Sequence, residues 1–313
     1  MMSIRFEDDT RHLATAPVVV GVDGSEAADA AVTWAAETAA QRGRELRIVH
    51  GLDLAEMRRI FEPYDVLEPS VFDTLRARGA ELVTRCAQRA LDTAPGLRVR
   101  TEVSKSDPVR MLLGYGGMAY LVVIGASGAT GLAAHAGSTM LAATSHAEGI
   151  TVVVRGDPEA GGHVRREGPV VVGLDCGPAG ERALAVAFEE AAERRSELVA
   201  VHVWDEMNFG RYAGESYSLY PPPNVEIREE ALVAERLAGW REKYPDVLVN
   251  SRVYPTDAAA TLLAWSRSAR LVVSGSRGRG RLASLLLGST SNALVQHARC
   301  PVMVAHPDDR DRS

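Results

Sequence analysis

The sequence predicts an α/β protein with two tandem doubly wound (Rossmann-like) domains, each built on a mostly parallel five-stranded sheet. Three observations lead to this prediction. The chain has 313 residues, which is about the length of two domains. Segments of the first half recur in the same order about 150 residues later. Continuous apolar runs alternate with amphipathic helical patterns, as in parallel sheets that helices cover on both faces.

The internal repeat consists of four pairs of similar segments in the same order. The pairs are APVVVGVDGS (16–25) with GPVVVGLDCG (168–177), LRIVHGLD (46–53) with LVAVHVWD (198–205), LVVIGASG (121–128) with LVVSGSRG (271–278), and the tripeptide GST at 137–139 and 288–290. This order indicates a tandem duplication. It predicts a first domain over residues 1–155, a polar and glycine-rich linker over 156–167, and a second domain over 168–313.

Within the first half, each apolar run predicts a buried strand and each amphipathic stretch predicts a helix. The predicted strands are 18–22, 46–51, 98–103, 121–125 and 150–154. The predicted helices cover roughly 26–42, 68–93, 107–117 and 138–147. The second half repeats this alternation, and the result is a doubly wound domain in each half.

Composition narrows the class of protein. Hydrophobic residues make up 46% and charged residues 24% of the chain, and the net charge is −6, so a general nucleic-acid binder is not expected. Three cysteines without C-x-x-C spacing argue against a disulfide framework or a zinc site. Neither a signal peptide nor a long apolar span is found, and we expect a soluble cytoplasmic protein without membrane contact.

The candidate site lies where strands end. Ligands of doubly wound sheets bind outside the carboxyl ends of the strands, so Asp23, Asp175 and the glycine loops should share one crevice in each half. Gly275 and Gly278 allow close approach of the backbone, and Gly288 leads into a helix with free N–H groups, which suggests a phosphate cradle. The alternatives are a tight turn at Gly275, an ordinary cap at Ser289, and turn or cap roles for the two aspartates. Arg281-Leu282 stands where a Walker A loop has Lys-Ser/Thr, and no G-x-G-x-x-G follows a strand.

The spacing Gly275-x2-Gly278-x9-Gly288-Ser289 resembles the ATP-binding motif of the universal stress protein family. The resemblance extends to VVVGVDGS, VVVGLDCG, LVAVHVWDE and HARCPVMVAH, and it covers both halves. It implies that ATP binds with Mg²⁺ held mainly by the phosphates, with no metal ligand or catalytic residue assigned to the chain. The implied nucleotide-contacting residues of the second half are Asp175, Val203 (through its backbone to adenine), Gly275, Gly278, Gly288, Ser289, Thr290 and Ser291. Those of the first half are Asp23, Gly51, Gly125, Gly128, Gly137, Ser138 and Thr139.

The resemblance implies an ATP-binding stress-response regulator whose nucleotide state tunes its conformation or the binding of an unidentified protein partner. The alternatives are a slow ATPase or nucleotide-activating enzyme of the related α-hydrolase folds, and, for the first half, an interaction module without nucleotide. In single-domain relatives the last strands pair across a dimer. This implies an intrachain pseudo-dimer through 150–154 and 301–305, and a homodimer of the whole chain is possible.

Two further features are interpreted from the residues. His50 and His202 are expected to be structural. The segment 204–223, which carries five aromatic residues, suggests a lid or partner surface, with a packed surface loop as the alternative.

The two halves are not expected to bind nucleotide equally. Eight residues separate Gly128 from Gly137, but nine separate Gly278 from Gly288, and the shorter arm can misplace a phosphate donor. Met140 also replaces Ser291, and Ser127 replaces Arg277. We therefore expect weaker ATP binding in the first half.

Overall fold

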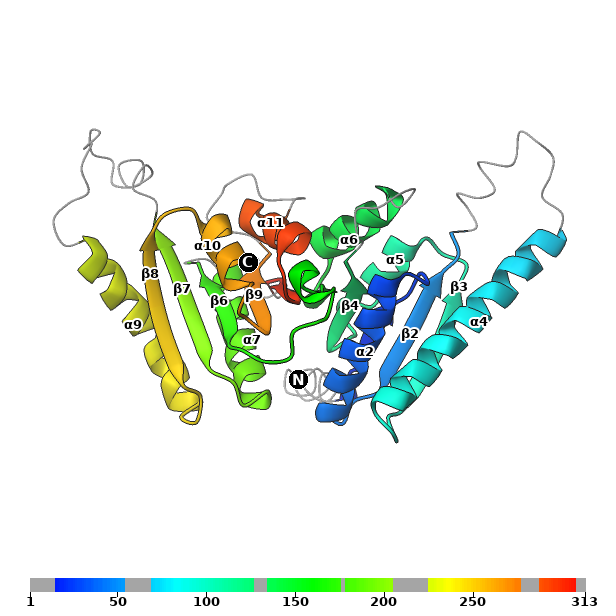
Figure 1. Cartoon of the computed structure of the whole chain (residues 1–313), viewed down its shortest axis with the longest axis horizontal. Coiled ribbons are helices and arrows are strands. Elements are labelled where there is room, and N and C mark those ends of the chain that lie inside the picture. Colours follow the sequence, from blue (N-terminus) through cyan, green and yellow to red (C-terminus); the bar gives the residue numbers. More distant parts are fainter. Residues whose placement is uncertain are drawn as a thin grey trace, which may run out of the picture. The chain divides into compact units, whose positions relative to one another are not determined.

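The computed structural model describes residues 15–53, 69–126, 134–175, 178–204, 225–276 and 287–307. It divides the chain into two compact units, Met1–Arg155 (unit 1) and Gly156–Ser313 (unit 2), and each is described by itself (Figure 1). No helix among these residues is long and apolar enough to cross a lipid bilayer.

Unit 1 contains one parallel sheet with the strand order β3-β2-β1-β4-β5. Its strands are β1 (Val18–Gly21), β2 (Leu46–Gly51), β3 (Val99–Ser104), β4 (Leu121–Gly125) and β5 (Ile150–Val154). Its helices are α2 (Glu26–Gln41), α4 (Pro69–Thr93), α5 (Pro108–Leu113) and α6 (Ala134–His146). Helix α2 packs beside α4, and α5 packs beside α6 (Figure 1). The predicted five-stranded doubly wound fold is confirmed for this unit.

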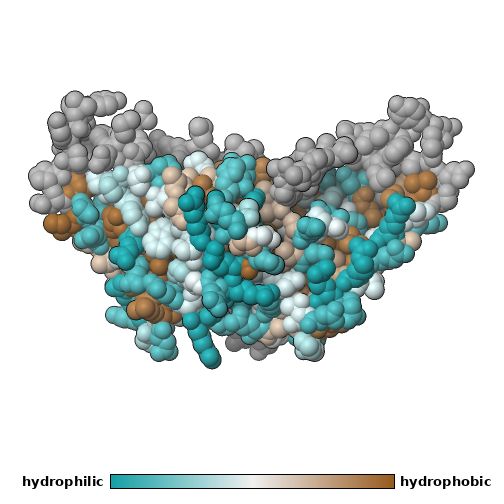
Figure 2. Space-filling model, viewed as in Figure 1, coloured by the Kyte–Doolittle hydropathy of each residue, from teal (hydrophilic) through white to brown (hydrophobic). Residues whose placement is uncertain are grey.

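Apolar side chains explain why these strands lie inside. The three valines of β1 and all five residues of β5 are buried, as expected for strands covered on both faces. Helix α4 has a narrower apolar stripe, because its buried residues recur every three or four positions at Gly79, Leu82, Val83, Cys86 and Ala90. The remaining face of α4 is mostly exposed, and hydrophilic residues cover the surface over this helix in Figure 2.

Unit 2 repeats this architecture with the strand order β8-β7-β6-β9-β10, again parallel throughout. Its strands are β6 (Val170–Leu174), β7 (Leu198–Trp204), β8 (Val249–Pro255), β9 (Leu271–Gly275) and β10 (Val302–Ala305). Its helices are α7 (Pro178–Glu193), α9 (Val225–Lys243), α10 (Ala258–Trp265) and α11 (Ser289–His297). Phe188 of α7 stacks on Trp240 of α9 at 5.7 Å between ring centroids, and α10 packs against α11.

Two helix boundaries differ from the prediction. Helix α5 ends at Leu113 instead of residue 117, because Gly114 follows and the next backbone bonds shorten to the i→i−3 pattern of Tyr115 N–H to Leu112 O. Helix α6 begins at Ala134, four residues before the predicted start at 138. The second difference changes the interpretation of the site in unit 1.

Residues 156–167, predicted as a linker, contain ordered structure. A short 3₁₀ helix, η2 (Pro158–Ala160), begins after Asp157, whose side chain accepts a hydrogen bond from the Glu159 N–H at 3.0 Å. Asp157 is buried, and it also pairs with Arg165 at 2.9 Å between Oδ2 and Nη2. Glu159 forms an ion pair with Arg299, just before β10. This segment therefore belongs to unit 2 and is tied to the residue before β10. The pairing of residues 150–154 with 301–305 stays a prediction.

Candidate functional site

Strand register brings the predicted residues of unit 2 to one edge of its sheet. Leu174 pairs with His202 between β6 and β7, so Asp175 and Val203 follow side by side at the carboxyl end. Val172 pairs with Val273 between β6 and β9, which places Gly275 at the same level of the neighbouring strand. Asp175, Val203 and Gly275 thus meet at one edge of the sheet, the edge at which doubly wound proteins bind their ligands.

The start of α11 offers backbone N–H groups at this edge. Gly288 is the N-cap residue, and no side-chain hydrogen bond caps the helix within the described residues. The first intrahelical bond runs from the Asn292 N–H to the Gly288 carbonyl at 2.8 Å. The preceding N–H groups of Ser289, Thr290 and Ser291 therefore lie in the first turn, where a helix has no internal partner for them. Ser289 is not the cap of this helix, so that alternative is wrong.

Ser291 has a structural contact of its own. Its side chain is buried, and its hydroxyl donates to the Gly275 carbonyl at 2.6 Å. The Gly288 N–H also donates to the Ser276 carbonyl at 2.9 Å. These two bonds join the start of α11 to the end of β9. The Ser291 hydroxyl proton is used in the bond to Gly275. Gly278 and the arginines at 277, 279 and 281 lie outside the described residues.

Both histidines have protein partners, as expected for structural residues. The His50 Nδ1–H donates to the Val22 carbonyl at 2.7 Å. His202 is buried, and its Nε2 lies 2.7 Å from Oε2 of Glu229 on the first turns of α9. Most of the aromatic segment 204–223, from residue 205 onward, falls outside the described residues.

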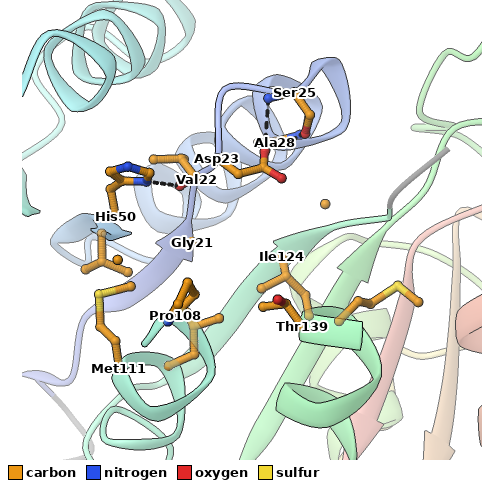
Figure 3. Close-up of a pocket in the computed structure, with 15 residues that line it drawn as sticks. Gly21, Val22, Asp23, Ser25, Ala28, His50, Pro108, Met111, Ile124 and Thr139 are labelled. Atoms are coloured by element: carbon orange, nitrogen blue, oxygen red, sulfur yellow. Dashed lines mark hydrogen bonds between the residues drawn. The ribbon is translucent and has the colours of Figure 1, made fainter. Parts of the chain in front are cut away.

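Unit 1 contains a cavity of about 110 Å³ at the carboxyl edge of its sheet (Figure 3). Apolar groups from several elements form most of its wall. The lining residues are Gly21, Val22, Asp23, Ser25, Ala28, Val49, His50, Gly51, Pro108, Met111, Leu112, Ile124, Gly125, Thr139 and Met140. Figure 3 shows Asp23 and Ser25 on one side of this cavity and Thr139 on the other. Four predicted residues of unit 1 (Asp23, Gly51, Gly125 and Thr139) therefore line one cavity.

Asp23 also organises the start of α2. Its Oδ1 accepts from the Ser25 N–H at 3.0 Å and from the Ser25 hydroxyl at 2.6 Å. The Ser25 oxygen in turn accepts from the Ala28 N–H at 3.1 Å and caps the helix. The proposed turn role of Asp23 is thus present in unit 1. The side chain remains exposed, and its Oδ2 takes no part in this turn.

Two glycines of unit 1 are required by packing. A Cβ on Gly125 would lie 2.4 Å from the carbonyl carbon and oxygen of Ala27, because α2 passes directly over the end of β4. A Cβ on Gly51 would lie 2.9 Å from Cα of Pro108, at the start of α5. These contacts give each glycine a structural reason that is independent of any ligand.

The second half of the motif in unit 1 lies inside a helix. Since α6 begins at Ala134, Gly137, Ser138 and Thr139 occupy its fourth to sixth positions. The N–H groups of Ser138 and Thr139 follow the carbonyls of Ala134 and His135 by four residues, the spacing of hydrogen bonds within an α-helix. Gly128 lies outside the described residues. Pro108 and Met111 of the cavity wall were not predicted from the sequence. The Asp-Pro pair at 107–108, a helix start directly after the third strand, is the signal that could have revealed them.

A duplicated, fully parallel α/β sheet with a glycine motif at each carboxyl edge defines the class as a tandem doubly wound protein. The model of the universal stress protein family matches residues 15–155 and again residues 168–306, and the chain belongs to this family. The predicted family is confirmed.

Similar proteins share the two-domain length. A universal stress protein of Mycolicibacterium smegmatis is 38% identical over 296 residues, which cover 93% of this chain and 97% of that protein. One from Mycobacterium tuberculosis is 38% identical over 292 residues, covering 92% and 96%. The crystal structure of a universal stress protein from Archaeoglobus fulgidus has the same fold, with a TM-score of 0.65, 18% identity, and coverage of 95% and 98%.

Proposed function

We propose that this chain binds ATP in unit 2 and acts as a stress-response regulator whose nucleotide state tunes its conformation or its binding to a protein partner. The observation that carries the proposal is the first turn of α11, which no side chain of the described residues caps and which stands at the same sheet edge as Asp175 and Val203. A helix start with unused N–H groups and the positive end of its dipole favours a phosphate group. Membership of the universal stress protein family supports the same site.

The proposed contacts follow from the strand order. The backbone N–H groups of Ser289, Thr290 and Ser291 face the phosphates, and Gly275 with Gly278 allows the ligand to approach the chain. Asp175 lies beside the sugar and the Mg²⁺ that the phosphates carry, and the Val203 backbone lies beside adenine. Strand register supports this order, since Asp175 stands between the β7 and β9 exits.

Regulation is favoured over rapid turnover by the groups at this edge. Fast phosphoryl transfer to water needs a group that positions and deprotonates the nucleophile. His202, the described histidine at this edge, is already paired with Glu229 at 2.7 Å. We propose ATP turnover far below the enzyme median of about 10 per second. Cys86 and Cys300 are buried free thiols, which supports a reducing, cytoplasmic location.

Titration calorimetry of the full chain with MgATP tests the site through Gly288→Ala. Gly288 has a φ of −57° and a ψ of 149°, a conformation that alanine adopts without strain. A loss of affinity therefore reports the added Cβ at the ligand, and we expect at least tenfold, or about 1.4 kcal/mol. Unchanged affinity would mean that Gly288 belongs only to a turn.

The chain provides a matched control at Gly137→Ala. This glycine is the first-half equivalent, but it lies within α6, where alanine is favoured over glycine by about 1 kcal/mol. We expect ATP affinity to stay within twofold of the parent. Turnover is measured on the same preparations. A rate near 10 per second that Asp175→Ala abolishes would replace the regulatory proposal with an enzymatic one.

A further inference from the structure

The last turns of α2 in unit 1 and α7 in unit 2 have the same backbone hydrogen bonds. In each unit, the first and third residues after the helix donate to carbonyls four and five residues earlier. The residue before β4 or β9 donates to the proline carbonyl that precedes the first strand of its unit. These bonds match four residues of unit 1 with four of unit 2, at the opposite sheet edge from the candidate nucleotide site. The pairs are Thr38 with Glu190, Arg42 with Arg194, Arg44 with Ser196, and Tyr120 with Arg270.

Unit 2 has its own carboxylate at this place. Glu190 is buried, and its Oε2 lies 2.8 Å from Nε of Arg194 in the next turn. Their side chains are 2% and 9% exposed, so water and salt screen this pair little. Arg270 also approaches, since its Nη1 donates to the Arg194 carbonyl at 3.4 Å. A buried guanidinium needs a negative charge nearby, and Glu190 supplies it.

Unit 1 has a threonine where unit 2 has this glutamate. Thr38 is 1% exposed, and its Oγ1 has no hydrogen-bond partner in the part of the chain that the structure describes. A buried hydroxyl without a partner is unfavourable, because it has given up its bonds to water. A glutamate side chain reaches farther from the backbone than a threonine side chain. Residue 38 of unit 1 therefore does not fill the place that the Glu190 carboxylate takes in unit 2.

Two arginines of unit 1 lie against the ring of Tyr120. The guanidinium carbon of Arg44 is 3.8 Å from the ring centre, and that of Arg42 is 5.7 Å from it. Nη1 of Arg44 donates to the Ala16 carbonyl at 2.8 Å. Nε of Arg42 donates to the Tyr120 hydroxyl at 3.2 Å, so the O–H of this tyrosine is a further donor. The ring attracts both cations but carries no net charge, so it does not neutralise them as a carboxylate does.

We infer that unit 1 binds a small anion of the size of chloride or formate, held by Arg42, Arg44 and the Thr38 hydroxyl. The anion takes the place that the Glu190 carboxylate occupies in unit 2, and this sets its size. The negative end of the α2 dipole opposes an anion in the last turn. Glu190 stands in the same turn of α7, however, where the adjacent arginine compensates for the dipole. Because the anion binds only the folded unit, the stability of unit 1 should rise with the anion concentration.

Broadening of the chloride NMR signal by the full chain measures chloride exchange at a protein site and tests this inference. Chloride replaces gluconate, which is too large for the place of one carboxylate, at constant ionic strength. We expect protein-dependent broadening that formate competes away. Thr38→Glu supplies the carboxylate that unit 2 has and should remove at least half of this broadening. Arg44→Gln should weaken chloride binding by about tenfold, and its MgATP affinity should stay within about twofold of the parent, because the nucleotide site lies at the other edge.

Urea unfolding gives a second readout with a matched control. Thr38→Gln has the size of Thr38→Glu without its charge. In gluconate, Thr38→Glu should unfold at a higher urea concentration than Thr38→Gln, because only the glutamate offsets the charge of the arginines. Chloride should raise the unfolding midpoint of the parent and leave that of Thr38→Glu unchanged.

Three results would overturn the inference. A parent without chloride broadening has no such site, and broadening that Thr38→Glu or Arg44→Gln leaves unchanged places the chloride elsewhere on the chain. Equal unfolding midpoints of Thr38→Glu and Thr38→Gln in gluconate would mean that this place needs no negative charge. If Thr38→Glu does not fold, Arg44→Gln decides alone: a loss of chloride affinity supports the site, and an unchanged affinity refutes it.

Discussion

Replacing Asp157 with alanine should open the folded segment of residues 156–167 without unfolding the sheet of unit 2. The Asp157 side chain is buried and holds this segment with two charge-assisted hydrogen bonds, from Arg165 at 2.9 Å and from the Glu159 N–H at 3.0 Å. The backbone of Asp157 also pairs with His163. The Asp157 side chain thus connects residues 157, 159 and 165 of one short segment. Its removal should open that segment before the rest of unit 2 unfolds.

The expected loss of free energy on local opening depends on how exposed the hydrogen-bonding partners of Asp157 are. Hydrogen bonds to charged groups contribute about 1.5–3 kcal/mol each, but Arg165 is 33% exposed, so water screens its pairing with Asp157. We therefore discount the pair and expect a loss of about 2 kcal/mol for local opening. This corresponds to an open population about 30-fold larger.

Limited trypsin digestion, followed by mass spectrometry, measures this opening at the Arg165–Arg166 bond. When opening and closing are fast relative to cleavage, the cleavage rate tracks the open population, so it should rise about 30-fold. Asp157→Asn keeps an acceptor for the Glu159 N–H and should fall between the parent and Asp157→Ala. Glu159→Gln removes an exposed ion pair with Arg299 and should change little. An unchanged cleavage rate in Asp157→Ala would refute the reasoning.

Three further predictions concern positions inside the packed structure. Gly125→Ala should destabilise unit 1 by about 3 kcal/mol in urea unfolding, the upper end for overpacking, because the added Cβ meets backbone atoms of Ala27. Unchanged stability would contradict the packing argument. Ser291→Ala should lower the free energy of unfolding by about 1–3 kcal/mol, because the Gly275 carbonyl loses the hydrogen bond from the Ser291 hydroxyl. A larger effect on ATP affinity than on stability would instead assign Ser291 to the ligand. Burial raises the pKa of Cys300 to about 12, so iodoacetamide at pH 8 should label it only in urea. The folded state holds that proton more tightly, so stability should decline as the pH rises from about 9 toward 12. This decline should be smaller in Cys300→Ala, where only groups such as Cys86 and Tyr115, whose pKa values burial also raises, still contribute.

Most of the fold could be predicted from the sequence because its strands are continuous apolar runs. Residues 121–124 and 150–154 are all buried, which is typical of parallel strands that are covered on both faces. The tandem repeat then supplied the order of elements in the second half. Helix α2 was predicted within one residue, since Ser25 caps its start and Gly43 follows its end.

The cavity wall of unit 1 could not be predicted in the same way. It depends on the close approach of Gly51 to Pro108 and of Gly125 to Ala27, pairs that lie far apart in the sequence. A glycine in a motif looks the same whether it makes room for a ligand or for a neighbouring helix. Only the tertiary contacts distinguish these two reasons.

The tripeptide GST shows that the same local sequence does not determine where a helix begins. At 288–290 it starts a helix, and at 137–139 it continues a helix that began at Ala134. Alanines at 134 and 136 favour that earlier start, because alanine has the highest helix propensity and nothing in the repeat opposes it. A backbone N–H can bind an anion only if no carbonyl of its own helix has taken it. The number of backbone donors that the tripeptide can offer is therefore set by where its helix begins, and the two copies differ in this number.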